Sequence, residues 1–266
     1  CLIRGHPFHL PIPHILCQTS LMTRTLATIC LTLAVLLGSA GVSWGSDLQE
    51  GKSAYFNDNY LLALALLTPH ADKGSMFAQI TLALIFSKGG HGVSKNDVKA
   101  AKYYELAANQ GFLNAQYYTA ANYHVGRGVL QDFKAAEYWY TKCAEQKSVT
   151  EKPPMPLVLC RHFLAVMYYK GTEIARNYSK AKFWLLKAVE LGAHSSMLNL
   201  GVMYAKGEGV IQDHVSAHMW FNIASSKGAK GVDKYRDQIA KSMTPVQIAE
   251  AQKLARECVR KKYKGC

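Results

Sequence analysis

The sequence predicts an all-α protein built from a row of similar helix pairs, that is, a solenoid. Three observations support this prediction: one phrase of residues recurs four times, each copy holds two stretches with helical spacing, and glycine and Asn or Asp separate the stretches. A hydrophobic content of 49% over 266 residues is enough for a continuous core. The pattern leaves no place for strands.

The first stretch of each copy is expected to be a helix that ends at glycine. A small residue and an aromatic residue eight positions later lie on one helix face and can pack inward. Glycine three positions further suits the left-handed backbone that commonly ends a helix. These positions are Ala78, Ala115, Cys160 and Ser196, then Phe86, Tyr123, Tyr168 and Tyr204, then Gly89, Gly126, Gly171 and Gly207.

The second stretch starts with a capping residue and alternates small and bulky side chains. Asn or Asp accepts hydrogen bonds from the free N–H groups of the new helix. Small residues let neighbouring helices approach, and the aromatic residue fills the gap between hairpins, so we expect Trp139, Trp184 and Trp220 to be largely buried. The positions are Asn96, Asp132, Asn177 and Asp213, then Ala100, Ala136, Ala181 and Ala217, then Tyr103 and the three tryptophans, then Ala107, Cys143, Ala188 and Ala224.

The third copy departs from a period of 36 residues in two ways. The step from Ala115 to Cys160 is 45 residues, because the proline-rich loop Gln146–Pro156 is inserted. Its turn is Gly171-Thr172-Glu173-Ile174 where the others have Gly-x-Gly-Val or a close variant. We expect this turn to be less tightly wound.

The N-terminal part has the pattern of a secretory signal peptide that starts at Met22. Arg24 precedes an apolar run from Leu26 to Leu37, and small residues follow it. The run has 12 residues, whereas a membrane span needs roughly 20. We therefore expect cleavage near Ser46, export to the periplasm or beyond, and no stable membrane span after cleavage.

The predicted organisation continues to the C-terminus with two capping regions around the repeats. A helix pair precedes the first copy, and Thr244 with Pro245 begins a late helix after the fourth. The segments are 1–21 (upstream translated sequence), 22–45 (signal peptide), 46–74 (capping hairpin), 75–111 and 112–147 (repeats one and two), 148–156 (insertion), 157–192 and 193–229 (repeats three and four), and 230–266 (helical extension).

The phrases at 124–146 and 200–229 resemble the Sel-one-like repeat family, relatives of the tetratricopeptide repeat. The resemblance covers roughly residues 75–229, and residues 236–256 resemble an extension often found after such repeats in bacterial proteins. It implies a right-handed α-α superhelix whose concave groove contacts another protein, often as an adaptor. The identity of that protein cannot be predicted from the groove.

Signals for catalysis, metals and cofactors are weak. Some cysteine-rich family members have been linked to β-lactams, and Ser179-Lys180-Ala181-Lys182 matches a Ser-x-x-Lys string, but Ser-Asp-Asn and Lys-Thr-Gly partners are lacking from residue 46 onward. His194, His214 and His218 cluster in repeat four, where a structural or solvent-facing role is favoured over zinc. No cofactor and no metal are expected.

Four cysteines remain after signal removal, an even number for an oxidising compartment. Cys143 and Cys160 occupy neighbouring small positions across the insertion, so a disulfide between them is predicted; the alternative is two buried thiols in place of alanine. Cys258 and Cys266 either clip the tail or stay free and pair between molecules.

The last residues form a basic run, within a protein that has 31 Lys and Arg against 18 Asp and Glu. Its ordinary role is a solvated helix end. The functional alternative is a patch for an acidic protein, lipid headgroup or polysaccharide, while export disfavours nucleic acid. The run comprises Lys253, Arg256, Arg260, Lys261, Lys262 and Lys264.

The function predicted from the sequence is an exported, non-enzymatic scaffold that binds another protein. The alternative is a secreted hydrolase acting on β-lactam or cell-wall substrates, for which Ser179 would be required. A third hypothesis is a purely structural subunit.

Overall fold

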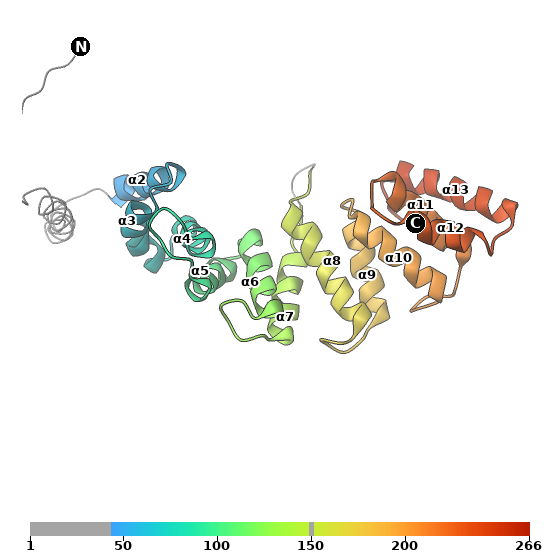
Figure 1. Cartoon of the computed structure of the whole chain (residues 1–266), viewed down its shortest axis with the longest axis horizontal. Helices are drawn as coiled ribbons and strands as arrows, with labels where there is room; N and C mark the ends of the chain where they lie inside the picture. Colours follow the sequence, from blue (N-terminus) through green and yellow to red (C-terminus); the bar gives the residue numbers. More distant parts are fainter. Residues whose placement is uncertain (1–43, 149–151) are drawn as a thin grey trace, which may run out of the picture. The chain divides into compact units, whose positions relative to one another are not determined.

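The computed structural model describes residues 44–148 and 152–266, and over these residues it consists of helices, turns and loops without strands. The protein divides into two compact units, residues 1–50 and 51–266. The signal peptide expected at 22–45 and the segment 1–21 lie outside the described residues, apart from Trp44 and Gly45. The helices labelled in Figure 1 are α2 Trp44–Phe56, α3 Tyr60–Asp72, α4 Met76–Lys88, α5 Asp97–Asn109, α6 Leu113–Val125, α7 Phe133–Ala144, α8 Met155–Lys170, α9 Tyr178–Val189, α10 His194–Lys206, α11 His214–Ser226, α12 Asp233–Ala240 and α13 Pro245–Arg260.

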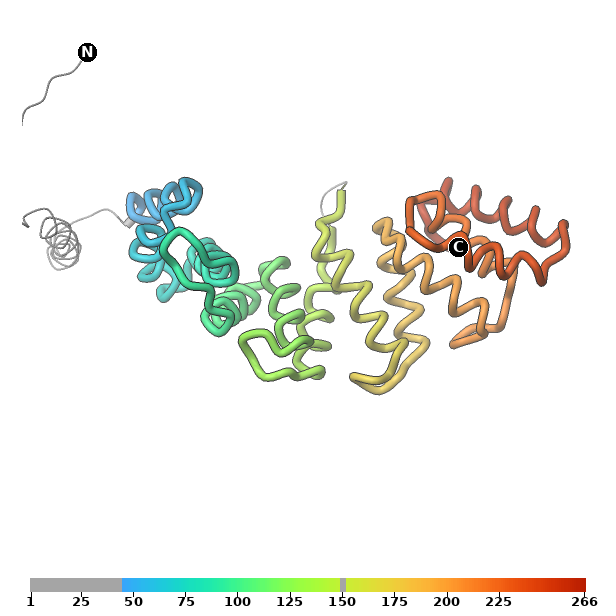
Figure 2. Tube along the Cα trace, viewed as in Figure 1, coloured from blue at the N-terminus to red at the C-terminus, as the bar shows by residue number. Residues whose placement is uncertain are grey.

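The second unit is an all-α solenoid in which neighbours in sequence are neighbours in space. Four hairpins form, from α4 with α5, α6 with α7, α8 with α9, and α10 with α11. Each hairpin packs on the next through α5 on α6, α7 on α8 and α9 on α10 (Figure 2). After the last hairpin the order changes, because α12 and α13 both pack on α11. The predicted fold class is confirmed.

Each hairpin turn is closed by the residues that the sequence places there. In the second hairpin, Gly126 has left-handed backbone angles (φ 73°, ψ 32°) and ends α6. The N–H of Asp132 then donates to the carbonyl of Tyr123 at 3.0 Å, while its carboxylate accepts from the N–H groups of Lys134 and Ala135. The same backbone bond and the same cap recur at Asn96, Asn177 and Asp213.

The core follows the small and bulky positions of the repeat, with one difference. The small positions of both helices are buried, from Ala78 to Ala224. Trp220 is 1% exposed and Trp139 is 7% exposed, but Trp184 is only partly buried, packed against the core at its edge. All three tryptophans are therefore buried over most of their surface, but Trp184 less completely than the other two. The ring of Phe183, which is 52% exposed, packs edge-on against it at 4.9 Å between centroids.

Candidate functional site

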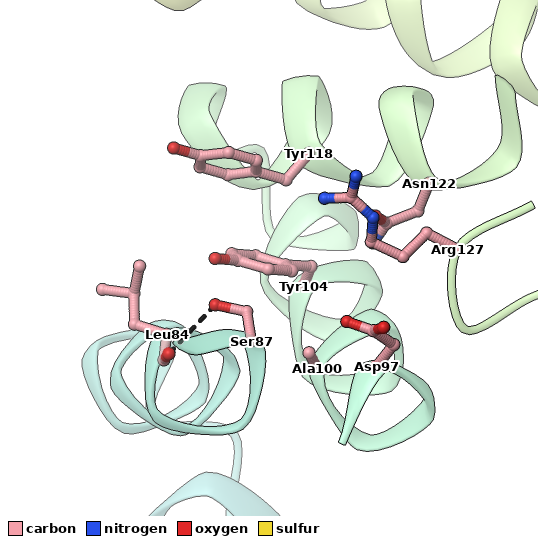
Figure 3. A pocket seen from close by; sticks show the side chains of 8 residues that line it. All are labelled: Leu84, Ser87, Asp97, Ala100, Tyr104, Tyr118, Asn122 and Arg127. Carbon is pink, nitrogen blue, oxygen red and sulfur yellow. Dashed lines mark hydrogen bonds between the residues drawn. The ribbon is translucent and has the colours of Figure 1, made fainter. Parts of the chain in front are cut away.

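A cavity of about 210 Å³ lies among α4, α5 and α6, at the boundary between the first two repeats (Figure 3). The rings of Tyr104 and Tyr118 lie 4.8 Å apart between centroids and are tilted by 30°, and Arg127 extends towards them from the turn after α6. Burial raises the pKa of the Tyr104 phenol to about 12. The lining residues are Leu84, Ser87, Asp97, Ala100, Tyr104, Tyr118, Asn122 and Arg127.

The predicted covalent link between repeats two and three is present in the structure. Cys143 on α7 and Cys160 on α8 form a disulfide, with Cα atoms 6.0 Å apart. Both residues are fully buried, in positions that hold alanine or serine in the other repeats. The bond joins the two helices on either side of the insertion.

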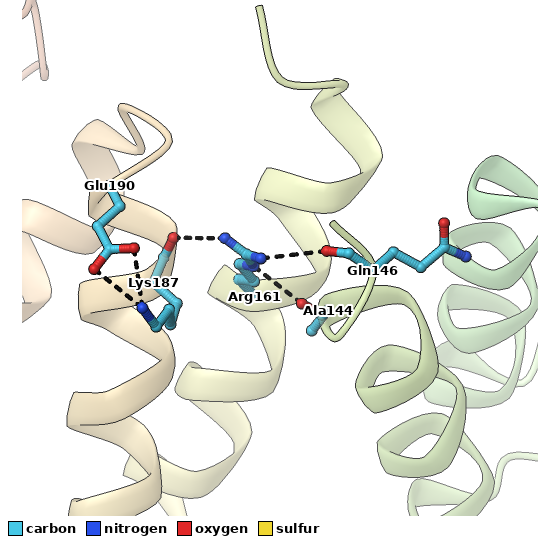
Figure 4. A network of polar contacts seen from close by, with 5 residues as sticks. All are labelled: Ala144, Gln146, Arg161, Lys187 and Glu190. Atoms are coloured by element: carbon cyan, nitrogen blue, oxygen red, sulfur yellow. Dashed lines mark hydrogen bonds and ion pairs between the residues drawn. The ribbon is translucent and has the colours of Figure 1, made fainter. Parts of the chain in front are cut away.

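Arg161, the residue next to this disulfide, ties three segments together (Figure 4). Its Nε donates to the carbonyl of Ala144 at 3.0 Å, and its guanidinium also reaches the carbonyls of Gln146 and of Lys187 on α9. Burial lowers the pKa of the guanidinium, and the nearby carboxylate of Glu190 opposes that shift. The planar fork of arginine therefore connects repeats two and three at the insertion.

Arg161 occupies a position that holds glutamine in the first two repeats. Gln79 and Gln116 each donate to a carbonyl at the end of the preceding helix, at 3.0 and 3.4 Å. Each also accepts from a second glutamine, Gln110 at 2.8 Å and Gln146 at 2.7 Å. Arginine makes the same bond as these glutamines and adds a bond to Lys187 on α9, the second helix of its own repeat.

The unusual turn of repeat three also contacts repeat two, on the other side of the insertion. Glu173 stands where the other repeats have glycine, and its Oε2 lies 3.2 Å from Nε2 of His124 on α6. Any side chain at the equivalent Gly128 would meet the backbone, because a Cβ there would lie 2.0 Å from the carbonyl oxygen of Asp97. The turn of repeat three therefore replaces close backbone packing with a polar contact between two side chains.

The remaining candidate residues do not converge on one centre. Ser179 is exposed at the start of α9, and Lys182 lies 5.6 Å over the ring of Tyr204 without a hydrogen bond to Ser179. His218 is buried and its Nδ1 has no partner, while His214 contacts Ser242. Over residues 44–148 and 152–266 no group of three or more His, Cys, Asp or Glu could hold a metal ion.

The basic run lies mostly exposed on α13 and the tail. A hollow of about 250 Å³ is lined by Lys253, Arg256, Glu257 and Arg260. A second disulfide joins Cys258 and Cys266, and the N–H of Tyr263 donates to the carbonyl of Cys258 at 2.9 Å. Within the described residues, no helix is long and apolar enough to cross a membrane.

These features define a helical-repeat protein, and comparison with known families identifies which one. A family model described as the Sel1 repeat matches residues 77–112, 113–148, 158–192 and 194–228, more than half of the sequence. The chain belongs to the Sel1 repeat family, whose members are generally protein-interaction scaffolds. No curated protein matches the sequence.

Several solved structures are similar. A Sel1 repeat protein from Oxalobacter formigenes is 25% identical, with a TM-score of 0.57 over 81% of this chain and 77% of that one. A protective antigen of uropathogenic Escherichia coli with an SLR fold is 25% identical, with a TM-score of 0.47 over 83% of this chain. This chain spans 55% of the length of that antigen. A Sel1 repeat protein of Klebsiella pneumoniae subsp. pneumoniae is 16% identical, with a TM-score of 0.40 over 74% of this chain and 93% of that one.

Sequence reasoning missed Arg161 and the cavity that Arg127 and Asn122 line. A comparison of the repeats position by position contains the signal for Arg161, since arginine replaces glutamine there. The same comparison shows a polar residue at Asn122 where the other repeats are apolar. The shape of the cavity has no counterpart in the repeat pattern, because it depends on rotamers in three helices.

Proposed function

We propose that this protein is an exported, non-enzymatic scaffold that holds another protein along its row of repeats. The observation that carries the proposal is the run of four consecutive Sel1 repeats, in a family that generally mediates protein contacts. Because consecutive hairpins bury a continuous core, the row is rigid enough to present several helices to one partner. The partner is proposed to contact the first helices of the hairpins, which would form the concave groove.

Export is proposed from the signal-like pattern at 22–45 and from the paired cysteines. Disulfides persist in oxidising compartments such as the periplasm, and two are present within the second unit. Segments 46–74 and 230–266 are proposed as caps of the solenoid. The exposed basic run from Lys253 to Lys264 is proposed as a secondary contact for an acidic partner.

Site-specific photo-crosslinking in a bacterial envelope fraction tests the scaffold. A photoreactive residue replaces Asn199, which is partly exposed on first helix α10, and, as the matched control, Tyr138, which is 53% exposed on second helix α7. We expect a discrete protein adduct from position 199 and none from position 138. The same adduct from both positions, or from neither, would contradict the proposed groove.

Two further measurements address export and catalysis. N-terminal sequencing of the processed protein should find a start close to Ser46, and a protein that retains Leu26–Leu37 would be anchored instead. Purified protein should not hydrolyse nitrocefin. Hydrolysis that Ser179→Ala abolishes would make the protein an enzyme.

A further inference from the structure

Helix α6 carries two polar residues in positions that are apolar in every other repeat. Asn122 takes the position of Ile85, Met167 and Met203, which are at most 1% exposed. Three residues earlier on the same helix face, Thr119 takes the position of leucine. The corresponding leucines, Leu82, Leu164 and Leu200, are fully buried.

Neither polar group is satisfied by the protein. The hydroxyl of Thr119 has no hydrogen-bond partner, and the residue is 2% exposed. Asn122 is 9% exposed, and its carboxamide makes no hydrogen bond with any described residue. Native proteins pair nearly all buried polar groups, so the enclosed hydroxyl of Thr119 needs an explanation. The carboxamide of Asn122 is not fully enclosed, so it is open to a partner from outside the protein.

The carboxamide of Asn122 faces the cavity among α4, α5 and α6 (Figure 3). At about 210 Å³ this cavity is smaller than the pockets that enclose a drug-sized molecule, and it suits one residue of a polypeptide. A carboxamide offers both a donor and an acceptor, which is the combination that a peptide group requires. The ring of Tyr118 provides an apolar wall beside it.

The charge at the cavity favours an anion. The carboxylate of Asp97 is compensated by Lys95, whose Nζ lies 3.1 Å away. The guanidinium of Arg127 is exposed and has no ion pair within the described part of the protein. Guanidinium groups bind carboxylates through paired, charge-assisted hydrogen bonds. The uncompensated group at this cavity is therefore a cation suited to a carboxylate.

We propose that this cavity binds a carboxylate-bearing residue of a polypeptide. Arg127 binds the carboxylate, Asn122 donates to and accepts from a peptide group, and Tyr118 contacts the neighbouring apolar side chain. The inference rests on the proposed scaffold function and names the chemistry that one site of the scaffold recognises. The carboxylate comes from the C-terminus of a polypeptide or from an Asp or Glu residue within it.

Three short peptides distinguish these sources. Acetyl-Gly-Gly-Leu as the free acid offers a terminal carboxylate, acetyl-Gly-Leu-Asp amide offers the carboxylate of an aspartate, and acetyl-Gly-Leu-Asn amide offers none. Each is titrated into the ¹⁵N-labelled full-length protein while the carboxamide resonance of Asn122 is followed. We expect that resonance to shift with one or both acids and not with the neutral peptide. Equal shifts with the neutral peptide, or none with any peptide, would overturn the proposal.

Variants separate binding from folding. Arg127→Gln should weaken binding of the acid at least roughly tenfold with no change of thermal midpoint, because the side chain is exposed. Asn122→Met restores the residue type of repeats three and four, so it should raise the midpoint while binding is lost. Arg176→Gln, at an exposed arginine in the turn after α8, is the matched control and should leave binding unchanged. Full binding by Asn122→Met, or equal weakening by both arginine variants, contradicts the site.

Failure of the carboxylate site can be told apart from failure of the proposed scaffold. If the photo-adduct forms but the peptides do not bind, the scaffold stands and the carboxylate site is wrong. If the acids bind with the expected dependence on Arg127 but no adduct forms, the site stands and the scaffold proposal fails.

Discussion

Removal of the disulfide between Cys143 and Cys160 should destabilise the solenoid mainly through the bond itself. Alanine is the natural replacement, because Ala107, Ala188 and Ala224 occupy the position of Cys143 in the other repeats and are all fully buried. The double alanine variant therefore removes the covalent bond and leaves side chains that the fold accepts in the same environment. Loss of packing should contribute little beyond the two sulfur atoms.

The sequence separation of the two cysteines sets the size of the expected destabilisation. The bridged residues are 17 positions apart, and closing a loop of that size restricts the unfolded state by roughly 3 kcal/mol in the chain-entropy model. The second disulfide is the matched control, since Cys258 and Cys266 are 8 positions apart and the same model assigns it roughly 2.5 kcal/mol. The two variants should differ by less than about 1 kcal/mol if loop closure is the whole effect.

Urea unfolding of each variant, followed by circular dichroism, measures these differences. The bond at Cys143 is expected to do more than close a loop if it also holds repeats two and three together across the insertion. In that case its removal should lower the free energy of unfolding by more, relative to the control variant, than the difference that loop closure predicts. Unchanged stability of the double alanine variant would refute the reasoning. Free alkylation of both thiols in protein from an oxidising compartment would refute the bond.

Three further substitutions and conditions test the core, a turn and a buried histidine. Trp220→Ala should cost roughly 3–5 kcal/mol, and Trp184→Ala distinctly less, because only Trp220 is fully enclosed; paired urea titrations compare them. Gly128→Ala should destabilise and lower the thermal midpoint, since its φ is 70° and its Cβ would lie 2.0 Å from the carbonyl oxygen of Asp97. Burial and, to a smaller extent, the charge of Arg236 lower the pKa of His218 in the folded state, so the unfolded state takes up a proton first as pH falls below the ordinary value of 6.5. The unfolding free energy should therefore decline from pH 7 towards pH 5, and His218→Gln should reduce that decline.

The fold could be predicted from the sequence because the same local pattern of residues recurs in all four repeats. Helix ends, caps and small positions are local signals, and Gly126 and Asp132 lie where their backbone requirements place them. The pairing of Cys143 with Cys160 followed from the same positions. The less complete burial of Trp184 did not, because it depends on which side chains the next hairpin presents to it.

The contacts of the insertion boundary could not be predicted in the same way. Arg161 bonds to carbonyls on α7, on the loop after it and on α9, so its role requires the packed geometry of three segments. The contact between His124 and Glu173 joins residues from two repeats whose relative placement depends on the inserted loop. Position-by-position comparison of the repeats marks Arg161 and Glu173 as departures from the pattern, but it does not identify their partners.

Repeat two has polar groups in its core and a reinforced boundary with repeat three, and this combination has a measurable consequence. Its first helix buries the unpaired hydroxyl of Thr119 and places Asn122 in a position that is apolar in the other repeats, whereas its boundary with repeat three carries the disulfide, Arg161 and Glu173. In a solenoid, stability is close to a sum of repeat terms and neighbour terms, so a weak repeat is kept folded by a strong boundary. Backbone amides of α6 and α7 should therefore lose hydrogen-exchange protection in the double alanine variant before those of α10 and α11 do. Equal loss across all four helices would mean that the disulfide supports the whole row, and the proposed coupling between the polar cavity and its stapled boundary would be wrong.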